Sequence, residues 1–507
     1  MAAPRTTNAL HDTSEAAGPP TSAPRVRTAP VLATVAMVQF LVTVDLSIVN
    51  IALPRIGDRL GFTPVGLTWV INAYALAFGG LLLLGGKAAD RYGRKRVLMF
   101  GLGLFGLASL AGGLATSPVA LVASRAAQGA GAAALAPAAL ALLTSTFPTG
   151  PARARAFGVW SAVNASGGAF GVVAGGLLTQ YAGWRWVMFV NVPLVAVALG
   201  FAGRGIVHDH RSARSAGGPD LLGAALVTAG MSLLVLGVVR TDRHPWSSTT
   251  TVATLAAAVA LLASFVVVER TTTRDPLLRL GLLTNRAVAG ANAFNLLLGA
   301  VMGSGFYFVV LYLQRVLDTG PAKTGTESLP FAFGVVAGSM LAVKLSHRFA
   351  PSVLLVAGGL VTALGYSGYA FLDADESFAH GILAPLVLSS VGYGLCLAPV
   401  VSVATAGVAA QETGIASALL NSSRQIGAAL GLAALGTAAY HRTGHVATPA
   451  ALTRGYALGL TLDAALLVAA VVVALTVLRQ PTAADIRATD DRMNTTEDTE
   501  LEGRGLS

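Results

Sequence analysis

About fourteen apolar segments follow one another along this sequence, and they constrain its fold more than any other feature. A helix needs about 20 apolar residues to cross the hydrocarbon core of a bilayer. The sequence therefore predicts an all-α integral membrane protein with about 14 transmembrane helices. The candidate spans are 31–53, 67–86, 97–116, 119–146, 155–180, 187–205, 220–239, 251–268, 287–313, 327–346, 352–371, 381–406, 413–438 and 456–478.

The composition supports a lipid environment. Only 11% of the 507 residues are charged, whereas a soluble chain carries about a quarter, so lipid has to replace the missing polar surface. A net charge of +10 raises the possibility of nucleic-acid binding, but the basic residues sit in short loops between apolar runs, so we expect no nucleic-acid partner. One cysteine, Cys396, allows no internal disulfide, and no Cys/His spacing predicts a metal site or a cofactor.

The distribution of basic residues predicts the orientation. If the N-terminus is cytoplasmic, 23 of the 34 Lys and Arg residues lie on the cytoplasmic side and 9 on the outer side, while Arg125 and Arg424 fall inside spans. Cytoplasmic loops of membrane proteins carry an excess of Lys and Arg. We therefore expect both termini in the cytoplasm and an even number of spans in a bacterial cytoplasmic (inner) membrane.

A weak internal echo suggests two halves. Asp90–Arg94 follows the second span, and His347–Pro351 stands at the matching place about half a chain later. Paired half-repeats are common in secondary transporters. The predicted organisation is a disordered tail, a six-helix bundle, a linker with two additional helices, a second six-helix bundle and a disordered tail, over 1–30, 31–205, 206–286, 287–480 and 481–507.

A few ionisable residues inside the spans are the candidate chemistry, because such groups are costly in a membrane and usually face a cavity or a partner. Asp45 lies in the middle of the first span and could exchange a proton, or be a structural carboxyl bonded to backbone. Arg125 in the fourth span could pair with ionised Asp45, or be a structural anchor. Arg424 could be a structural pin or bind a substrate carboxylate. Asp463 and Glu327 are expected near the outer ends of their spans, as solvated carboxylates or as a second proton or cation site.

Two glycine-containing segments are candidates for conformational gating. The loop after the second span contains Gly86, Asp90, Arg91, Gly93 and Arg94. Its glycines permit a tight turn, and Asp90 could hold the cytoplasmic side closed. The alternative is a basic loop without a gating role. The fifth span contains further glycines, three of them at four-residue spacing on one face. This face could slide or seal against another helix, or reflect ordinary small-residue packing. The glycines are Gly158, Gly167, Gly171 and Gly175.

Taken together, these segments resemble the major facilitator superfamily, specifically its fourteen-helix drug:proton antiporter branch, over about 31–480. The resemblance rests on several motifs in the same order, with Val172 departing from the family by replacing a proline in the fifth helix. The matching segments are Asp45–Pro54, Trp69–Tyr74, Gly86–Arg96, Arg125 with Gln128 and Gly129, the fifth-span glycines, Trp184–Trp186 with Phe189 and Asn191–Pro193, and Gly414 with Asn421, Arg424, Gln425 and Gly427.

The resemblance implies alternating access between two bundles, with a proton gradient as the energy source. We therefore expect a monomeric, proton-coupled exporter of antibiotics or other small amphipathic compounds, with proton coupling at Asp45 and Arg125. A proton-coupled transporter of a specific metabolite is the alternative; an enzyme is not expected, because no nucleophile–base pair or phosphate loop is found. The predicted substrate-binding residues are Asn72, Tyr74, Gln128, Trp160, Asn164 and Arg424.

Overall fold

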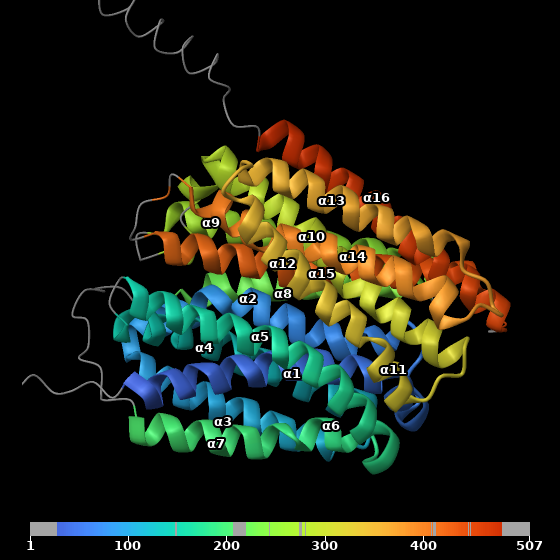
Figure 1. The fold of residues 1–507 in the computed structure, drawn as a ribbon, viewed down its shortest axis with the longest axis horizontal. Coiled ribbons are helices and arrows are strands. Elements are labelled where there is room, and N and C mark those ends of the chain that lie inside the picture. Colours follow the sequence, from blue (N-terminus) through green and yellow to red (C-terminus); the bar gives the residue numbers. More distant parts are fainter. Residues whose placement is uncertain are drawn as a thin grey trace, which may run out of the picture.

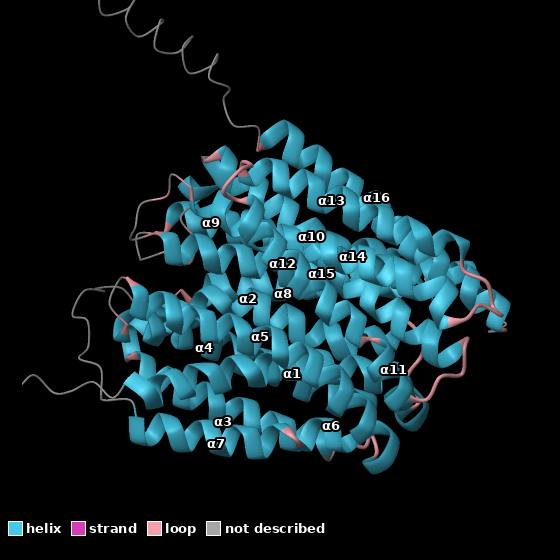
Figure 2. Ribbon diagram, viewed as in Figure 1, coloured by secondary structure: helices cyan, strands magenta, loops and turns pink. Residues whose placement is uncertain are grey.

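The computed structural model describes residues 28–147, 150–205, 220–242, 244–272, 276–278, 280–406, 408, 412–444, 446 and 448–478. These residues form helices and short connections, without strands (Figure 2). Most of both predicted tails and the linker residues 206–219 lie outside the described residues.

The first group of helices is the N-terminal bundle. It consists of α1 (Thr28–Leu60), α2 (Trp69–Tyr92), α3 (Arg94–Gly113), α4 (Pro118–Thr146), α5 (Pro151–Leu177), α6 (Arg185–Phe189) and α7 (Asn191–Gly205), with η1 (Gly66–Thr68) and η2 (Leu178–Ala182). A hairpin of α8 (Leu221–Val239) and α9 (Thr249–Thr271) follows, joined by η3 (Arg240–Asp242), and η4 (Leu280–Thr284) leads on from it.

The C-terminal bundle completes the fold. It consists of α10 (Arg286–Arg315), α11 (Pro321–Glu327), α12 (Leu329–Leu345), α13 (Pro351–Gly368), α14 (Leu383–Thr405), α15 (Thr413–Thr443) and α16 (Pro449–Val477), with η5 (Tyr369–Phe371) and η6 (Phe378–Ile382). In Figure 1 the blue-to-teal N-terminal bundle lies below the yellow-to-red C-terminal bundle.

The described helices account for the predicted spans. Thirteen helical segments are long and apolar enough to cross a membrane. The 31-residue α15 is less hydrophobic, because it carries polar residues such as Asn421 and Arg424. Counted with the thirteen, it brings the number of crossings to fourteen. One boundary error is in α1: the predicted span stops at 53, whereas the helix continues through Pro54 to Leu60.

The two bundles repeat one packing pattern. In the N-terminal bundle α1 contacts α5 and α7, and α4 contacts α2 and α3. In the C-terminal bundle α10 contacts α15 and α16, and α14 contacts α12 and α13. The expected two-bundle organisation is therefore present in the packing, and the α8–α9 hairpin lies outside it, against α2 and α15.

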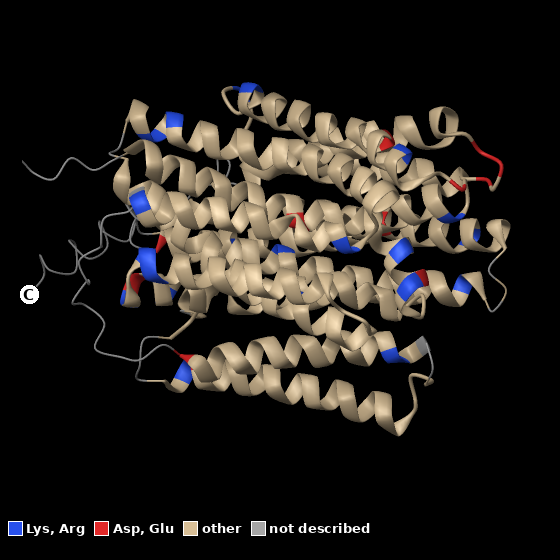
Figure 3. Cartoon of the chain, turned by 90° about the horizontal axis from the view of Figure 1, so that it is seen from below, with Lys and Arg blue, Asp and Glu red and all other residues tan. Residues whose placement is uncertain are grey.

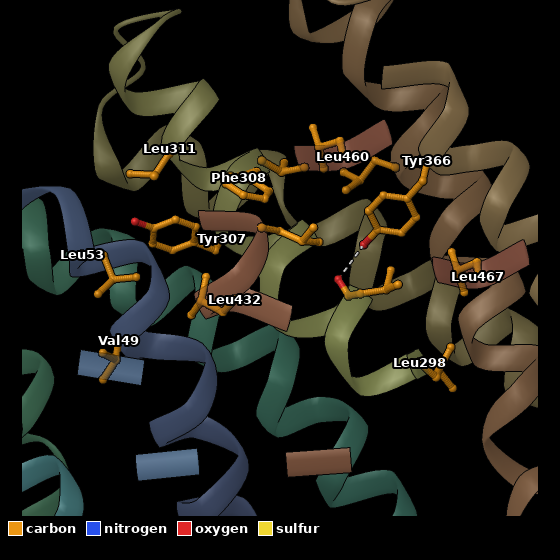
Figure 4. Packing of buried hydrophobic residues seen from close by; sticks show 14 of the residues in the cluster. Val49, Leu53, Leu298, Tyr307, Phe308, Leu311, Tyr366, Leu432, Leu460 and Leu467 are labelled. Atoms are coloured by element: carbon orange, nitrogen blue, oxygen red, sulfur yellow. Dashed lines mark hydrogen bonds between the residues drawn. The ribbon is translucent and has the colours of Figure 1, made fainter. Parts of the chain in front are cut away.

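Most charged residues lie near the two ends of the molecule, with few between them (Figure 3). We call the end at which α1 begins and α16 finishes the terminal end, and the other the far end. A hydrophobic core joins both bundles toward the far end; it includes Val49 and Leu53 of α1 together with Phe308 and Leu432 (Figure 4). A second core, which includes Val35 and Leu98, belongs to the terminal half of the N-terminal bundle.

Several direct contacts between the bundles also lie toward the far end, although Ser422 Oγ of α15 donates to Gly79 O in the middle of α2. Gln314 Nε2 donates to Ile51 O at 3.0 Å, and Arg315 forms an ion pair with Asp58 at 2.5 Å. The amide of Ala322 donates to Gln180 Oε1 at 2.9 Å. The shared core and these bonds hold the bundles together at the far end in this conformation.

Candidate functional site

Asp45 lies at the centre of a buried polar cluster in the N-terminal bundle. Its Oδ2 accepts from Arg125 Nη1 at 2.7 Å, and its Oδ1 accepts from Asn191 Nδ2 at 2.8 Å and Gln128 Nε2 at 3.2 Å. Asp45, Gln128 and Asn191 are fully buried, and Arg125 is 1% exposed. The predicted pairing of Asp45 with Arg125 is thus present. Gln128 and Asn191 enclose the pair together with Ser109, which accepts from Gln128 at 2.7 Å.

Arg125 has contacts on every side. Its Nε donates to Val70 O at 3.0 Å, and its Nη1 also contacts Gln128 Oε1 at 2.9 Å. Its guanidinium carbon lies 4.4 Å from the centre of the Tyr74 ring. A planar guanidinium can make several directed hydrogen bonds while stacking on an aromatic ring, and a lysine ammonium cannot. The site therefore fits arginine specifically.

Close helix packing positions this cluster. Gly129 of α4 faces α2, where an added Cβ would lie 3.0 Å from Ala77 Cβ and 3.1 Å from Phe78 N. Small residues let helix backbones approach closely in membranes. One helical turn before Gly129, this close approach brings Arg125 over Tyr74 and within reach of Val70 O. The Arg125–Gly129 segment therefore sets both the helix spacing and the ion pair.

Sequence reasoning missed two members of this cluster. Asn191 is the first residue of α7, immediately after the short helix α6, and Ser109 lies on α3. The signal for Asn191 was present, since it is an amide in an otherwise apolar segment. A hydroxyl such as Ser109 gives no comparable signal, because serine commonly bonds to its own helix, as Ser109 also does to Phe105 O.

Three predicted substrate-binding residues do not line an open cavity in this conformation. Asn72, Tyr74 and Gln128 are each 0% exposed. Tyr74 and Gln128 instead belong to the Asp45–Arg125 cluster, because α4, which carries Gln128, packs on α2, which carries Tyr74. Asn72 is enclosed with neither side-chain polar atom hydrogen-bonded.

The other three predicted substrate-binding residues are more accessible. Asn164 of α5 is exposed, and its Oδ1 accepts from Gln39 Nε2 at 2.7 Å and Thr43 Oγ1 at 2.8 Å. Trp160 is half-buried beside Phe157. Arg424 of α15 is half-buried, donates to Asn421 Oδ1 at 2.9 Å and forms no ion pair within the described part of the chain.

A polar group between α10 and α15 was not predicted. Ser423 Oγ lies 2.6 Å from Asn292 Oδ1, and Asn295 Nδ2 donates to Leu420 O at 2.6 Å. These residues lie close in sequence to Arg424. Together with it they give the C-terminal bundle several groups that can hydrogen-bond a polar ligand.

The predicted glycine face of α5 packs on α1. An added Cβ at Gly171 would lie 2.7 Å from Ser47 Cβ, and one at Gly175 would lie 2.8 Å from Ile48 O; Gly167 faces Thr43 at 3.3 Å. Gly158 does not belong to this contact: it is exposed, with nothing within 4 Å of an added Cβ. It lies beyond the length over which the two helices touch closely, and its predicted role in gating stays a prediction.

Most of the loop predicted to gate the terminal end is helical, because α2 continues past the predicted end at 86 to Tyr92 and α3 begins at Arg94, so Gly93 alone forms the tight turn between them. Gly93 has φ +94°, a conformation that L side chains rarely adopt. Gly86 makes only ordinary contact, 3.7 Å from Pro137 Cβ, whereas its neighbour Gly85 packs directly on the α4 backbone. Asp90 is exposed beside Arg94, and its role as a latch stays a prediction, as do those of Arg91 and Arg94.

Comparison with known proteins identifies the family. The family described as the Major Facilitator Superfamily matches residues 35–432. The chain belongs to the major facilitator superfamily. Its relatives in this superfamily include the cephamycin export protein CmcT of Amycolatopsis lactamdurans, 41% identical over 82% of this chain and 86% of the relative. The puromycin resistance protein pur8 of Streptomyces alboniger is 40% identical over 83% of this chain and 85% of the relative.

Solved structures share this fold. A bacterial homologue of the human lysosomal transporter Spinster, in an inward-facing and unoccupied conformation, has a TM-score of 0.61 at 17% identity, over 91% of this chain and 100% of that one. The POT family transporter PepTSo has a TM-score of 0.65 at 14% identity, over 89% and 97%. This major facilitator protein is therefore a multi-pass membrane transporter for small molecules, with the fold expected from its sequence.

Proposed function

We propose that this protein is a proton-coupled exporter of antibiotics or related small amphipathic compounds. The observation that carries the proposal is the enclosed ion pair of Asp45 and Arg125, bridged at 2.7 Å with almost no exposure. The printed names of CmcT and pur8 support antibiotic export as the direction and substrate class. The exported compound is thus expected to resemble an antibiotic rather than a common metabolite.

The proposed orientation places the terminal end in the cytoplasm and the far end outside the cytoplasmic membrane. The bias of Lys and Arg toward the terminal side supports it. With this orientation, the shared core and bonds at the far end close the outer side in the present conformation. The substrate would then enter from the cytoplasm between the bundles.

Protonation of Asp45 is the proposed switch. Loss of its negative charge removes the attraction to Arg125 and one acceptor for Asn191 and Gln128. Removing one partner of a buried ion pair costs about 3–5 kcal/mol, because the remaining charge is uncompensated. Arg125 can relieve that cost only if α4 and α1 rearrange so that it reaches water or another partner.

The packing offers a path from this switch to the outer closure. Asp45 lies on α1, and α1 bonds to α10 through Ile51 O and also carries the tightly packed α5. Movement of α1 would therefore disturb the far-end contacts. The membrane potential supplies about 2.3 kcal/mol per charge per 100 mV, which is comparable with the free energy of a few such contacts.

The first test is drug resistance in a sensitive bacterial host that expresses the full chain. The antibiotic panel should contain a cephamycin and puromycin. We expect the wild-type protein to raise resistance to at least one compound, and Asp45→Asn to abolish this at equal membrane abundance. Resistance in Asp45→Asn equal to that of the wild type would remove Asp45 from coupling.

Energised membrane vesicles test the proton directly. Everted vesicles that contain the wild-type protein should accumulate the responsive compound when the lumen is made more acidic than the medium. Accumulation should stop when this pH gradient is collapsed. The matched control is Asp375→Asn, which alters an exposed carboxylate outside the buried cluster. Accumulation that does not depend on the gradient would contradict proton coupling.

A further inference from the structure

A second buried carboxyl lies in the C-terminal bundle. Asp463 is in the middle of α16, and its residue is 0% exposed. The sequence placed it near the outer end of a span, as a solvated carboxylate or as a second proton or cation site. The position and the solvated form are wrong, because α16 begins seven residues before the predicted start at 456 and encloses the side chain. Leu460 and Leu467, one turn to either side, are fully buried in the core drawn in Figure 4.

The hydrogen bonds around Asp463 are incomplete for a carboxylate. Its Oδ1 lies 2.7 Å from Ser304 Oγ, and its Oδ2 has no hydrogen-bond partner. Ser304 Oγ also lies 2.7 Å from Ala300 O on its own helix. A serine hydroxyl has one hydrogen and cannot donate to both oxygens. A protonated Asp463 resolves this, since it can donate to Ser304, which then donates to Ala300.

The charged surroundings of Asp463 differ from those of Asp45. Within the described residues, Asp463 has no ion pair, and no basic side chain acts on it from α10, α13, α15 or η5. The titratable group that faces it is Tyr366 of α13, whose hydroxyl lies 3.5 Å from Val301 O (Figure 4). A bare carboxylate buried without a cation costs several kcal/mol, so the neutral acid is the stable form here.

The repeated packing of the two bundles relates the position of Asp463 on α16 to a position on α7. α16 contacts α10 and α13 as α7 contacts α1 and α3. Asp463 lies on α16 and Asn191 on α7, the helices that occupy these corresponding positions. Both side chains reach a polar partner in the middle of the first helix of their bundle, Ser304 in one and Asp45 in the other. The buried carboxyl therefore lies on α1 in the N-terminal bundle, paired with Arg125, and on α16 in the C-terminal bundle, without a basic partner among the described residues.

A metal cation would fit this place poorly. Among the described residues, the oxygens grouped at Asp463 are its own carboxyl and the hydroxyl of Ser304, whereas hard cations such as Ca²⁺ take six to eight oxygen ligands. A proton needs only one acceptor oxygen. The chemistry of the position therefore favours a proton as its ligand.

The position also couples to movement of the bundles. Val310 of α10 packs with Ile51 of α1, and Gln314 of α10 bonds to the same residue. Ser304 lies fewer than two helical turns before Val310 on the same helix. Rocking of the bundles about the far end would therefore move the hydroxyl that holds Asp463.

We propose that Asp463 is a second proton-carrying carboxyl, protonated in this conformation and deprotonated when movement of α10 admits water. Its role in the transport cycle rests on the proposed proton-coupled function, but its protonation here does not. Each bundle then has its own proton site: Asp45 is paired with Arg125 while Asp463 is neutral. The two sites can be loaded in different conformations.

The substrate-free test is infrared difference spectroscopy of the purified full-length protein at neutral pH. We expect wild type minus Asp463→Asn to show a carboxylic-acid C=O stretching band, and wild type minus Asp58→Asn to show none, because Asp58 is exposed and paired with Arg315. Ser304→Ala should shift the band, since it removes the hydroxyl that accepts the hydrogen bond of the Asp463 acid. Absence of the band in the Asp463 difference spectrum would overturn the proposal.

The transport test counts protons per exported molecule in proteoliposomes. Asp463→Asn should still move the compound, with about one proton fewer per cycle, whereas Asp45→Asn should abolish coupled movement. An unchanged stoichiometry in Asp463→Asn would show a structural acid and contradict the carrying role. If the wild type exports no compound, the proposed function fails, and the infrared result still decides whether Asp463 holds a proton. Ser304→Ala serves as the second variant should Asp463→Asn fail to fold.

Discussion

At the scale of single residues, the two buried carboxyls illustrate how one side chain acquires different properties. Asp45 accepts from Arg125, Asn191 and Gln128, so its charge is compensated. Asp463 has one polar neighbour, Ser304, and no cation in the described part of the chain. Hydrogen bonds and opposite charge favour the ionised form, and burial without them favours the neutral one.

The first residue-scale prediction concerns the energetics of the buried ion pair. Arg125→Leu should lower the free energy of unfolding by about 3–5 kcal/mol, because it leaves Asp45 charged and buried. Asp45→Leu combined with Arg125→Leu should recover most of this stability, since neither charge remains. Thermal unfolding in detergent measures the change. A double variant as unstable as the single one would show that the pair is held by packing rather than by charge.

The same double variant separates stability from transport. It should be stable and present in the membrane, yet confer no resistance, because it has lost the proposed proton switch. Arg125→Lys should also lose most resistance, since a lysine ammonium cannot maintain the contacts with Val70 O and the Tyr74 ring. Resistance equal to the wild type in Arg125→Lys would show that a positive charge alone is sufficient.

At the scale of helices, small residues decide which elements approach one another. α5 packs on α1 through Gly167, Gly171 and Gly175, and α4 packs on α2 through Gly129. The second contact positions Arg125 against Tyr74, and the first attaches α5 to the helix that carries Asp45. Helix spacing and site geometry are therefore set by the same residues.

A matched pair of substitutions tests the α1–α5 contact. Gly171→Ala places a methyl group 2.7 Å from Ser47 Cβ, so it should destabilise the protein by about 1–3 kcal/mol through overpacking. Gly158→Ala adds its methyl group to open space and should be neutral or stabilising by up to about 1 kcal/mol, since alanine is the better helix former. The measurement is the melting temperature in one detergent, and equal values for the two variants would contradict the assignment.

The turn between α2 and α3 gives a second element-scale prediction. Gly93 has φ +94°, so Gly93→Ala should cost about 1–3 kcal/mol in backbone strain. Gly86→Ala is the control, because its methyl group would make only ordinary contact, 3.7 Å from Pro137 Cβ. Limited proteolysis at the terminal end should detect a loosened turn in the first variant. Equal protection of both variants would show that the turn tolerates a side chain.

At the scale of the whole molecule, the far end is closed by a shared core and by a few polar bonds. The core spans both bundles, while the buried residues of the second core come from the N-terminal bundle, with Ala418 of α15 packed against them. The largest hydrophobic contact between the bundles therefore lies toward the far end. The Arg315–Asp58 ion pair lies at the surface of this closure, with exposed fractions of 39% and 51%.

Charge reversal tests how this ion pair influences the closure. Arg315→Glu should weaken it, and Asp58→Lys with Arg315→Glu should restore it. An exposed ion pair contributes about 0.2–1 kcal/mol, so the population of far-end-closed molecules should change by about fivefold at most. Distances between spin labels on the far-end loops of the two bundles measure that population; Cys396 is buried and should not react. A double variant that behaves like the single one would show that the pair plays no part.

The sequence alone determined the number of crossings, the two-bundle organisation, the family and the pairing of Asp45 with Arg125. These follow from local hydropathy, short motifs and the cost of charge in lipid, which are properties of each segment. Tertiary structure decided which face of each helix is buried, and with it the place of Asn191 in the cluster, the enclosure of Asn72, the exposure of Gly158 and the burial of Asp463. In a chain whose helices are apolar on almost every side, hydrophobicity does not select one face; only packing against the other helices does.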